Sequence, residues 1–202
     1  MRTAAVVTLL ASSPALAGAP SVSTFSEEAP YLAAADADAS YNFDDYFDNL
    51  PPGNWTANIG PGPGASAFAD LFHISVTAPA HRYIGPDGDH GAHSYAMYAF
   101  DQSAMRDHTG TMLVEFVEPV VAFGAYYTYS VYTPGTQAET YSLTLLRDGV
   151  AGEPLTVDAD QYVLIEDDQP FDAVLIIATS GEGAPSVETI DDLTGRLAVI
   201  AS

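Results

Sequence analysis

The residues of this chain that could do chemistry are mostly carboxylates, and two pairs of them stand near opposite ends of the sequence. Asp44-Asp45 lies in an early aromatic segment, and Asp191-Asp192 in an apolar segment near the end. Calcium takes about 6–8 oxygen ligands, so carboxylates from both pairs plus backbone carbonyls would suit it if the segments converge. Adjacent strand residues point to opposite faces, so at most one member of each pair would face a shared site. The alternative is that the pairs are solvated strand ends or turn caps.

A second polar cluster lies between Gly85 and His93, where Asp87 and Asp89 stand beside His90. A transition metal could use two imidazoles and a carboxylate. However, the glycines of the segment break the helix that a paired-histidine zinc motif requires. The oxygen-rich setting favours calcium on Asp87 and Asp89, and the alternative is an exposed turn whose acids cap the backbone.

The aromatic run from Tyr126 to Tyr132 is the candidate ligand-binding face. Strand alternation places Tyr127 and Tyr129 on one side. Trp55, the single tryptophan, lies in a proline- and glycine-rich stretch, residues 50–65, that predicts a long loop. Flat amphipathic rings stack on sugar faces, which makes Trp55, Tyr127 and Tyr129 the predicted carbohydrate-binding residues. The alternative is that the tyrosines only pack within the sheet, where they are favoured.

Catalytic signatures are weak in this sequence. The Gly-x-Ser-x-Gly pattern of a nucleophile elbow does not occur. Paired carboxylates for glycoside hydrolysis can be chosen almost anywhere in so acidic a chain, so their presence alone indicates nothing. The sequence therefore favours a non-catalytic protein and names no catalytic residue.

Composition excludes several classes of partner and site. The 202 residues hold 27 Asp and Glu against 5 Arg, with no lysine and no cysteine, and the formal net charge is -22. Such a chain repels nucleic acid and anionic membranes. It forms no disulfide and no zinc–thiolate site. The charge suits either solubility in salty surroundings or the binding of divalent cations.

The first 17 residues predict an export signal. Arg2 precedes an apolar run, and Ala15-Leu16-Ala17 supplies a small-x-small cleavage site. The run is shorter than the roughly 20 residues that cross a bilayer. We therefore expect cleavage after Ala17 and a secreted, periplasmic or cell-surface protein with no membrane span. Residues 18–40, rich in Ala, Ser, Pro and Asp, predict a flexible arm.

The rest of the chain, residues 41–202, predicts a single antiparallel jelly-roll-like β-sandwich, an all-β fold. Short apolar runs with period two alternate with turn signals such as Asp148-Gly149. Only one or two helical turns are expected, near 68–72 or 103–107. The predicted strands are 71–77, 95–100, 111–116, 120–129, 141–147, 161–165, 173–179, 187–193 and 196–200.

Three short motifs support a family resemblance. They are Phe47-Asp48-Asn49-Leu50-Pro51-Pro52-Gly53, the segment from Val114 to Gly124 with Glu118-Pro119-Val120 at its centre, and Ile190-Asp191-Asp192-Leu193. This layout resembles exported bacterial β-sandwich proteins of the PEP-CTERM-associated type, whose jelly-roll domains look like lectins and carbohydrate-binding modules. The chain departs from that family because it lacks the Pro-Glu-Pro motif, the terminal hydrophobic helix and the basic end.

The sequence thus predicts a secreted, non-catalytic binding module that takes a carbohydrate and uses calcium as structural support. The first alternative is a structural or assembly protein of the cell envelope or extracellular matrix, which would self-associate through exposed edge strands. The second alternative is a glycoside hydrolase or lyase. A formal glycosylation sequon at Asn54-Trp55-Thr56 is not expected to be used behind a bacterial-looking leader.

Overall fold

We analysed a computed structural model that describes residues 18–42, 57–61, 66–76, 81–86, 95–100, 111–127, 138–180 and 188–199. These residues form one α-helix and one antiparallel sheet of 13 strands. The elements are β1 (Ser21–Phe25), α1 (Glu28–Ala35), β2 (Ala39–Tyr41), β3 (Ala57–Pro61), β4 (Ser66–Phe68), β5 (Phe72–Val76), β6 (His81–Pro86), β7 (Tyr95–Phe100), β8 (Met112–Tyr127), β9 (Ala138–Arg147), β10 (Val150–Ala151), β11 (Leu155–Asp158), β12 (Gln161–Ser180) and β13 (Glu188–Leu197).

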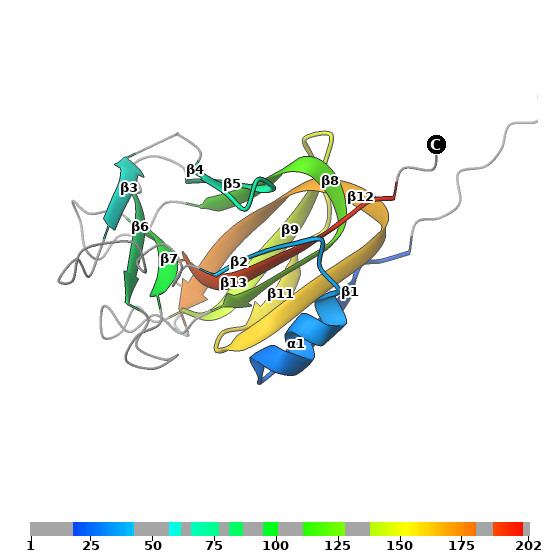
Figure 1. Cartoon of the computed structure of the whole chain (residues 1–202), viewed down its shortest axis with the longest axis horizontal. Helices are drawn as coiled ribbons and strands as arrows, with labels where there is room; N and C mark the ends of the chain where they lie inside the picture. Colours follow the sequence, from blue (N-terminus) through cyan, green and yellow to red (C-terminus); the bar gives the residue numbers. More distant parts are fainter. Residues whose placement is uncertain are drawn as a thin grey trace, which may run out of the picture.

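The sheet folds on itself because its two longest strands bend at the same place. β8 and β12 pair along most of their lengths, and their register shifts between Glu166 and Ala173 of β12. Figure 1 shows both strands curving through this bend. Pro119 and Pro170 lie at the bend, where a residue without an N–H suits a break in the ladder. The all-β, sandwich-like fold predicted from the sequence is confirmed.

The bend creates two layers. The first contains β4, β5, the start of β8, the end of β12, and β9 with β10 and β11. The second contains β1, the start of β12, the end of β8 and β13, followed by β2 and β7, with β6 and β3 beyond β7. The α-helix lies outside the second layer (Figure 1).

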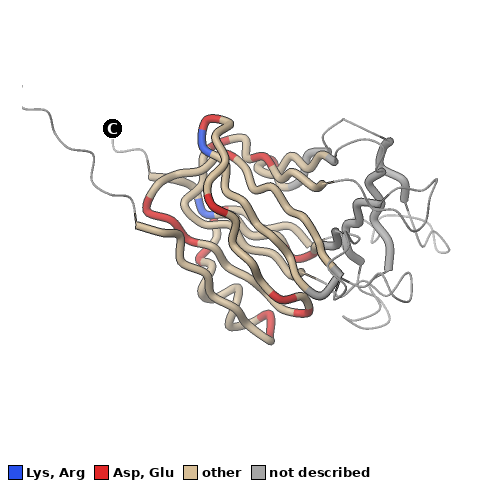
Figure 2. The backbone as a smooth tube through the Cα atoms, turned by 180° about the vertical axis from the view of Figure 1, so that it is seen from behind, with Lys and Arg blue, Asp and Glu red and all other residues tan. Residues whose placement is uncertain are grey.

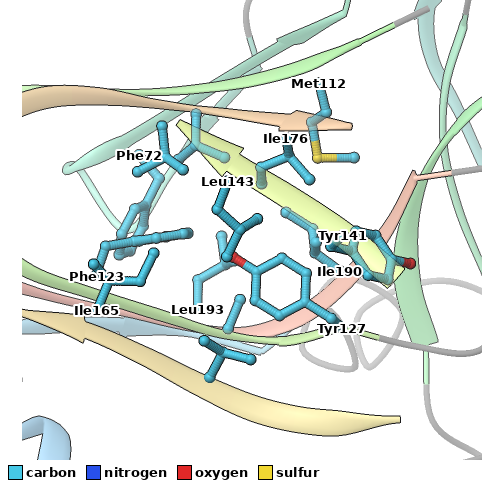
Figure 3. Packing of buried hydrophobic residues seen from close by; sticks show 14 of the residues in the cluster. Phe72, Met112, Phe123, Tyr127, Tyr141, Leu143, Ile165, Ile176, Ile190 and Leu193 are labelled. Atoms are coloured by element: carbon cyan, nitrogen blue, oxygen red, sulfur yellow. The ribbon is translucent and has the colours of Figure 1, made fainter. Parts of the chain in front are cut away.

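The core lies between the two layers and is made by alternating residues of both. Met112, Val114 and Phe116 are buried on one face of β8, as the period-two pattern predicted. Tyr141, Leu143 and Leu145 of β9 are buried in the same cluster, again as predicted. Figure 3 shows Phe72 and Phe123 packing among these side chains.

Residues 18–40 are not a flexible arm, and this corrects the prediction. β1 pairs with β12 at one edge of the second layer, and β2 pairs with β13 at the other side of that layer. Between them, α1 crosses the outer face of the layer. The alanine-rich composition that indicated disorder belongs to a helix, because alanine is the best helix former. We call residues 18–42 the N-terminal strap.

Local predictions had mixed outcomes. The Asp148-Gly149 hairpin between β9 and β10 is confirmed, and both residues have the positive φ of a type I′ turn, 50° and 74°. The helical turn expected at 68–72 is wrong, since Ala69 and Asp70 form a tight turn between β4 and β5. The second one, at 103–107, lies outside the described residues, as does the leader. Within the described part of the chain, no helix has the length and apolar character to cross a membrane.

Candidate functional site

The candidate site is built around Asp191 and Asp192, two adjacent carboxylates buried on β13. Their exposed fractions are only 1% and 7%. Asp191 is opposite Tyr126 of β8 and Thr194 is opposite Gly124, so β13 carries one extra residue, a β-bulge. Asp192 sits in this bulge with a left-handed φ of 49°, a conformation that aspartate tolerates better than most residues. The bulge therefore interrupts the regular alternation of β13 at Asp192.

Neutral hydrogen-bond donors surround Asp192. The Asn42 side-chain amide donates to Oδ1 at 2.7 Å, and the Tyr162 hydroxyl donates to Oδ2 at 3.1 Å. The Asp192 backbone N–H itself donates to Oδ1 of Asp191 at 2.8 Å. Donors from the end of the strap and from β12 thus bind the two oxygens of Asp192, and the β13 backbone binds one oxygen of Asp191, as burial of a polar group demands.

The charges of both carboxylates act on the same tyrosine. Burial first, then the charge of Asp192 and its hydrogen bond, and more weakly the charge of Asp191, raise the pKa of Tyr162 well above its usual range. The two acids point to opposite faces only in a regular strand, and the bulge at Asp192 breaks that alternation.

The strap covers the site from outside the sheet. Tyr31 of α1 is fully buried, stacks on Tyr162 with ring centroids 4.8 Å apart, and donates its hydroxyl to the Asp192 carbonyl at 2.9 Å. Since that proton is used, the Thr194 hydroxyl is the donor of the 2.8 Å bond to Tyr31. Burial is the largest cause that raises the pKa of Tyr31, so this phenol stays neutral.

Gly124 of β8 makes this docking possible. A Cβ at Gly124 would lie 2.6 Å from the Tyr31 hydroxyl oxygen and 2.7 Å from Thr194 Oγ1. Only glycine leaves room for the ring at this position. The second apolar cluster, on the outer face of the sheet under α1, consists of Tyr31, Ala35, Ala122, Tyr126, Tyr162 and Leu164, with Phe25 packed against it.

The start of the predicted sandwich, at Tyr41 and Asn42, lies beside the closing strand β13 at this site. Strands β7 and β2 follow one another along the same side of β13. The pairing of β7 stops with Met97 opposite Ile190, and that of β2 starts with Tyr41 opposite Leu193. Asp191 and Asp192 occupy the positions between them. Asp44 and Asp45 themselves lie outside the described residues, as do Asp87 and Asp89, the other predicted metal ligands.

The described residues include no group of three or more His, Cys, Asp or Glu side chains arranged to hold a metal. The arginines whose side chains are described do not neutralise the pair, because Arg147 pairs with Asp167 and Arg196 with Glu166. The described donors around the pair are instead hydroxyls and amides.

The predicted ligand face is not assembled as expected. Tyr127 is fully buried between the layers, 5.0 Å from the Tyr141 ring (Figure 3), so it is not available to stack on a ligand. This corrects the prediction for Tyr127. Trp55 and Tyr129 lie outside the described residues. Tyr126 points to the opposite face, as alternation predicted, and donates to Asp160.

Sequence reasoning missed the residues that hold Asp192 in place: Tyr31, Asn42, Tyr162 and Thr194. One signal for Tyr31 was present, because Tyr31 and Ala35 are four residues apart in a run of helix formers that begins with Glu28 and has Pro30 in its first turn. The other three residues give no signal that distinguishes them from ordinary strand residues.

Comparisons with known proteins identify no family. No protein-family model and no curated protein matches the chain. One similar solved structure is described as "X-ray structure of GH31 CBM32-2 bound to GalNAc"; it is 15% identical, with a TM-score of 0.36, over 51% of this chain and 77% of that one. A likeness of this size does not assign a function.

Proposed function

We propose that this protein is an exported, non-catalytic binding module that is stabilised by calcium and engages a carbohydrate. The observation that carries the proposal is the convergence of three chain segments on the buried Asp191-Asp192 pair. β2 leads from this point toward Asp44-Asp45, and β7 is entered from the segment that holds Asp87 and Asp89. The site of action would be secreted, periplasmic or at the cell surface, after cleavage of the leader.

The chemistry of the described groups fits calcium. Carboxylate oxygens are hard ligands of the kind that calcium prefers. Two adjacent buried anions repel one another, and a bound divalent cation would offset that repulsion. Asp191 and Asp192 would hold the ion together with oxygens from the segment that follows Asn42. The ion would supply charge neutralisation and would fix the chain after β2.

Calcium is expected to raise the melting temperature of the protein relative to a chelator. At a calcium concentration about 100-fold above Kd, linkage predicts stabilisation of about 2.7 kcal/mol. Asp192→Asn should abolish most of this shift, because it removes a ligand charge from the site. Asp168→Asn, which makes the same charge change at an exposed position of β12, should leave the shift intact. Melting curves that do not change at any calcium level would contradict the calcium site.

Sheet topology also supports a carbohydrate site at one end of the sandwich. The end of β8 at Tyr127 is opposite Ile190 of β13, and the end of β2 at Tyr41 is opposite Leu193 of the same strand. The segment that carries Tyr129 therefore leaves the sheet beside β13, and the segment that carries Trp55 runs from Tyr41, beside β13, to Ala57 of β3. Long connections at the end of a sandwich are frequent binding sites.

Glycan screening followed by titration tests this part of the proposal. Trp55→Ala is expected to weaken binding at least about tenfold, since buried aromatic contacts dominate binding energies. Tyr127→Phe is the matched control, because Tyr127 lies in the core and should leave affinity unchanged. Equal affinity of the Trp55 variant and the original protein would place the ligand elsewhere, and a failed screen in the presence of calcium would argue against carbohydrate binding.

A second candidate function is assembly into a layer of the cell envelope or matrix. The observation that favours it is the exposed edge of β1.

A further inference from the structure

Strand β1 forms an outer edge of the second layer. In the described part of the chain it pairs only with β12. All five residues run in unbroken register, from Ser21 opposite Glu166 to Phe25 opposite Tyr162. The first four residues of β1 are exposed. The side of β1 away from β12 therefore presents backbone N–H and C=O groups that can accept another strand.

The other edge strands of the described sheet are protected, and β1 is not. β10 has two residues, and β2 and β4 have three each, so they offer little to pair with. β3 ends in Pro61 and has a register shift near Gly60, and β11 carries Asp158. Proteins use short strands, proline, bulges and charge to prevent edge pairing. β1 has none of these within its length.

Charge indicates what kind of partner fits this edge. The chain carries a net charge of -22, and acidic positions occur in several separate parts of the described backbone (Figure 2). Residues 18–25, however, contain no charged residue. Two copies of such an acidic protein repel one another, and the repulsion is weakest where the contact itself is uncharged. An uncharged edge suits a second copy of this chain better than a cationic partner.

We propose that β1 pairs antiparallel with β1 of a second copy, about a two-fold axis at Ser23. In this register Ser23 is opposite Ser23 of the second copy, and Val22 is opposite Thr24. β-branched residues at such cross-strand positions favour pairing. Val22, opposite Ile165 of the core and still 38% exposed, would be covered by the new strand. The two sheets then become one continuous sheet with a closed, isologous contact.

Sedimentation equilibrium tests the proposal. The full chain is expressed with its own leader in an exporting host, and the protein is purified as that host delivers it. We expect a monomer–dimer equilibrium that tightens between about 0.1 M and 1 M salt, because salt screens the mutual repulsion. Ser23→Glu and Ser23→Lys should each weaken the dimer about fivefold or more, since like charges then face one another. An equimolar mixture of the two variants should restore it, because Glu then faces Lys.

The matched control is Val150→Glu, which adds the same charge to the short edge strand β10, at a side chain that is 70% exposed. It should leave the dimer unchanged. Ser23 is exposed, so its variants should keep the melting temperature of the original protein, which circular dichroism checks. A chain that stays monomeric at high salt overturns the proposal. The proposal is also overturned if Val150→Glu weakens the dimer and the Ser23 variants do not. It is overturned as well if the equimolar mixture of the two Ser23 variants fails to associate.

Discussion

Replacing Tyr31 by alanine is expected to lower the free energy of unfolding by about 3–5 kcal/mol, the range for removing a large buried aromatic side chain. Tyr31 is fully buried, stacks on Tyr162 and contacts the bulge of β13 through its hydroxyl. The space that it leaves lies between a helix and a sheet that have few other shared contacts. We therefore expect α1 to detach and Asp192 to become accessible to water.

Two variants on the same helix separate the contributions. Leu32→Ala removes a neighbouring side chain that is 42% exposed, and it should change the free energy of unfolding by less than about 1 kcal/mol. Tyr31→Phe keeps the ring but leaves the Asp192 carbonyl and the Thr194 hydroxyl without their partner, a loss of about 1–2 kcal/mol. Urea unfolding measures all three. If Tyr31→Ala behaved like Leu32→Ala, residues 18–35 would be the flexible arm that composition indicated.

The free energy of unfolding is expected to fall steeply at alkaline pH, because buried tyrosine hydroxyls resist ionisation in the folded protein. Burial, as the largest cause, raises the pKa of Tyr31, Tyr127 and Tyr162 above the ordinary value of 10.0. The folded protein keeps these three protons when the unfolded chain has lost them. Their contribution to stability is therefore complete below pH 10 and is lost as the pH rises above it. Three such groups lower the free energy of unfolding by about 4 kcal/mol for each pH unit above 10.

The chain has no lysine, so no lysine ammonium group titrates in the same pH range and the pH dependence can be assigned to tyrosine. Denaturant unfolding at a series of pH values gives the slope, and tyrosinate absorbance counts the ionised phenols. Of the 12 tyrosines, at most nine should ionise in the folded state near pH 10.5, a value about half a unit above the ordinary pKa. Tyr127→Phe and Tyr162→Phe should each reduce the slope by about 1.4 kcal/mol per pH unit. A slope that neither variant changes would contradict the assignment.

The core and the long strands of the sheet were largely predictable from alternation alone. Tyr95–Phe100 was predicted with its observed bounds, and the buried faces of β8 and β9 follow period two. The predicted strands 111–116 and 120–129 are one strand, β8, and 161–165 and 173–179 are one strand, β12. The predicted strands are interrupted at Glu118-Pro119 and at Asp167–Pro170. Charged residues and proline are typical of loops, so they do not distinguish a loop from a bend within one continuous strand.

The short strands and the helix were not predictable for a different reason. β1, β2, β10 and β11 have five residues or fewer and are largely exposed, so no apolar period distinguishes them from loops. Their pairing depends on β9, β12 and β13, which are distant in sequence. α1 buries only Tyr31 and Ala35, and two apolar contacts in eight residues give almost no amphipathic pattern.

The candidate site was partly predictable. The Asp191-Asp192 pair was singled out from the residues, but the bulge at Asp192 was not. A bulge one residue long, with its left-handed φ, leaves no mark in the sequence. Tyr127 was assigned to a ligand face because alternation separates two faces without showing which one is the interior.

The contacts of the N-terminal strap have a consequence for the order in which the protein folds. Tyr31 bonds to residues 161 and 163 positions further along the chain, and Asn42 to one 150 positions further. These hydrogen bonds of the strap therefore cannot form until β13 has been synthesised. Such long-range closure slows folding. A chain that ends before β13 leaves β2 without its paired strand and leaves the Tyr31 hydroxyl and Asn42 without Asp192, which makes incomplete chains prone to aggregate.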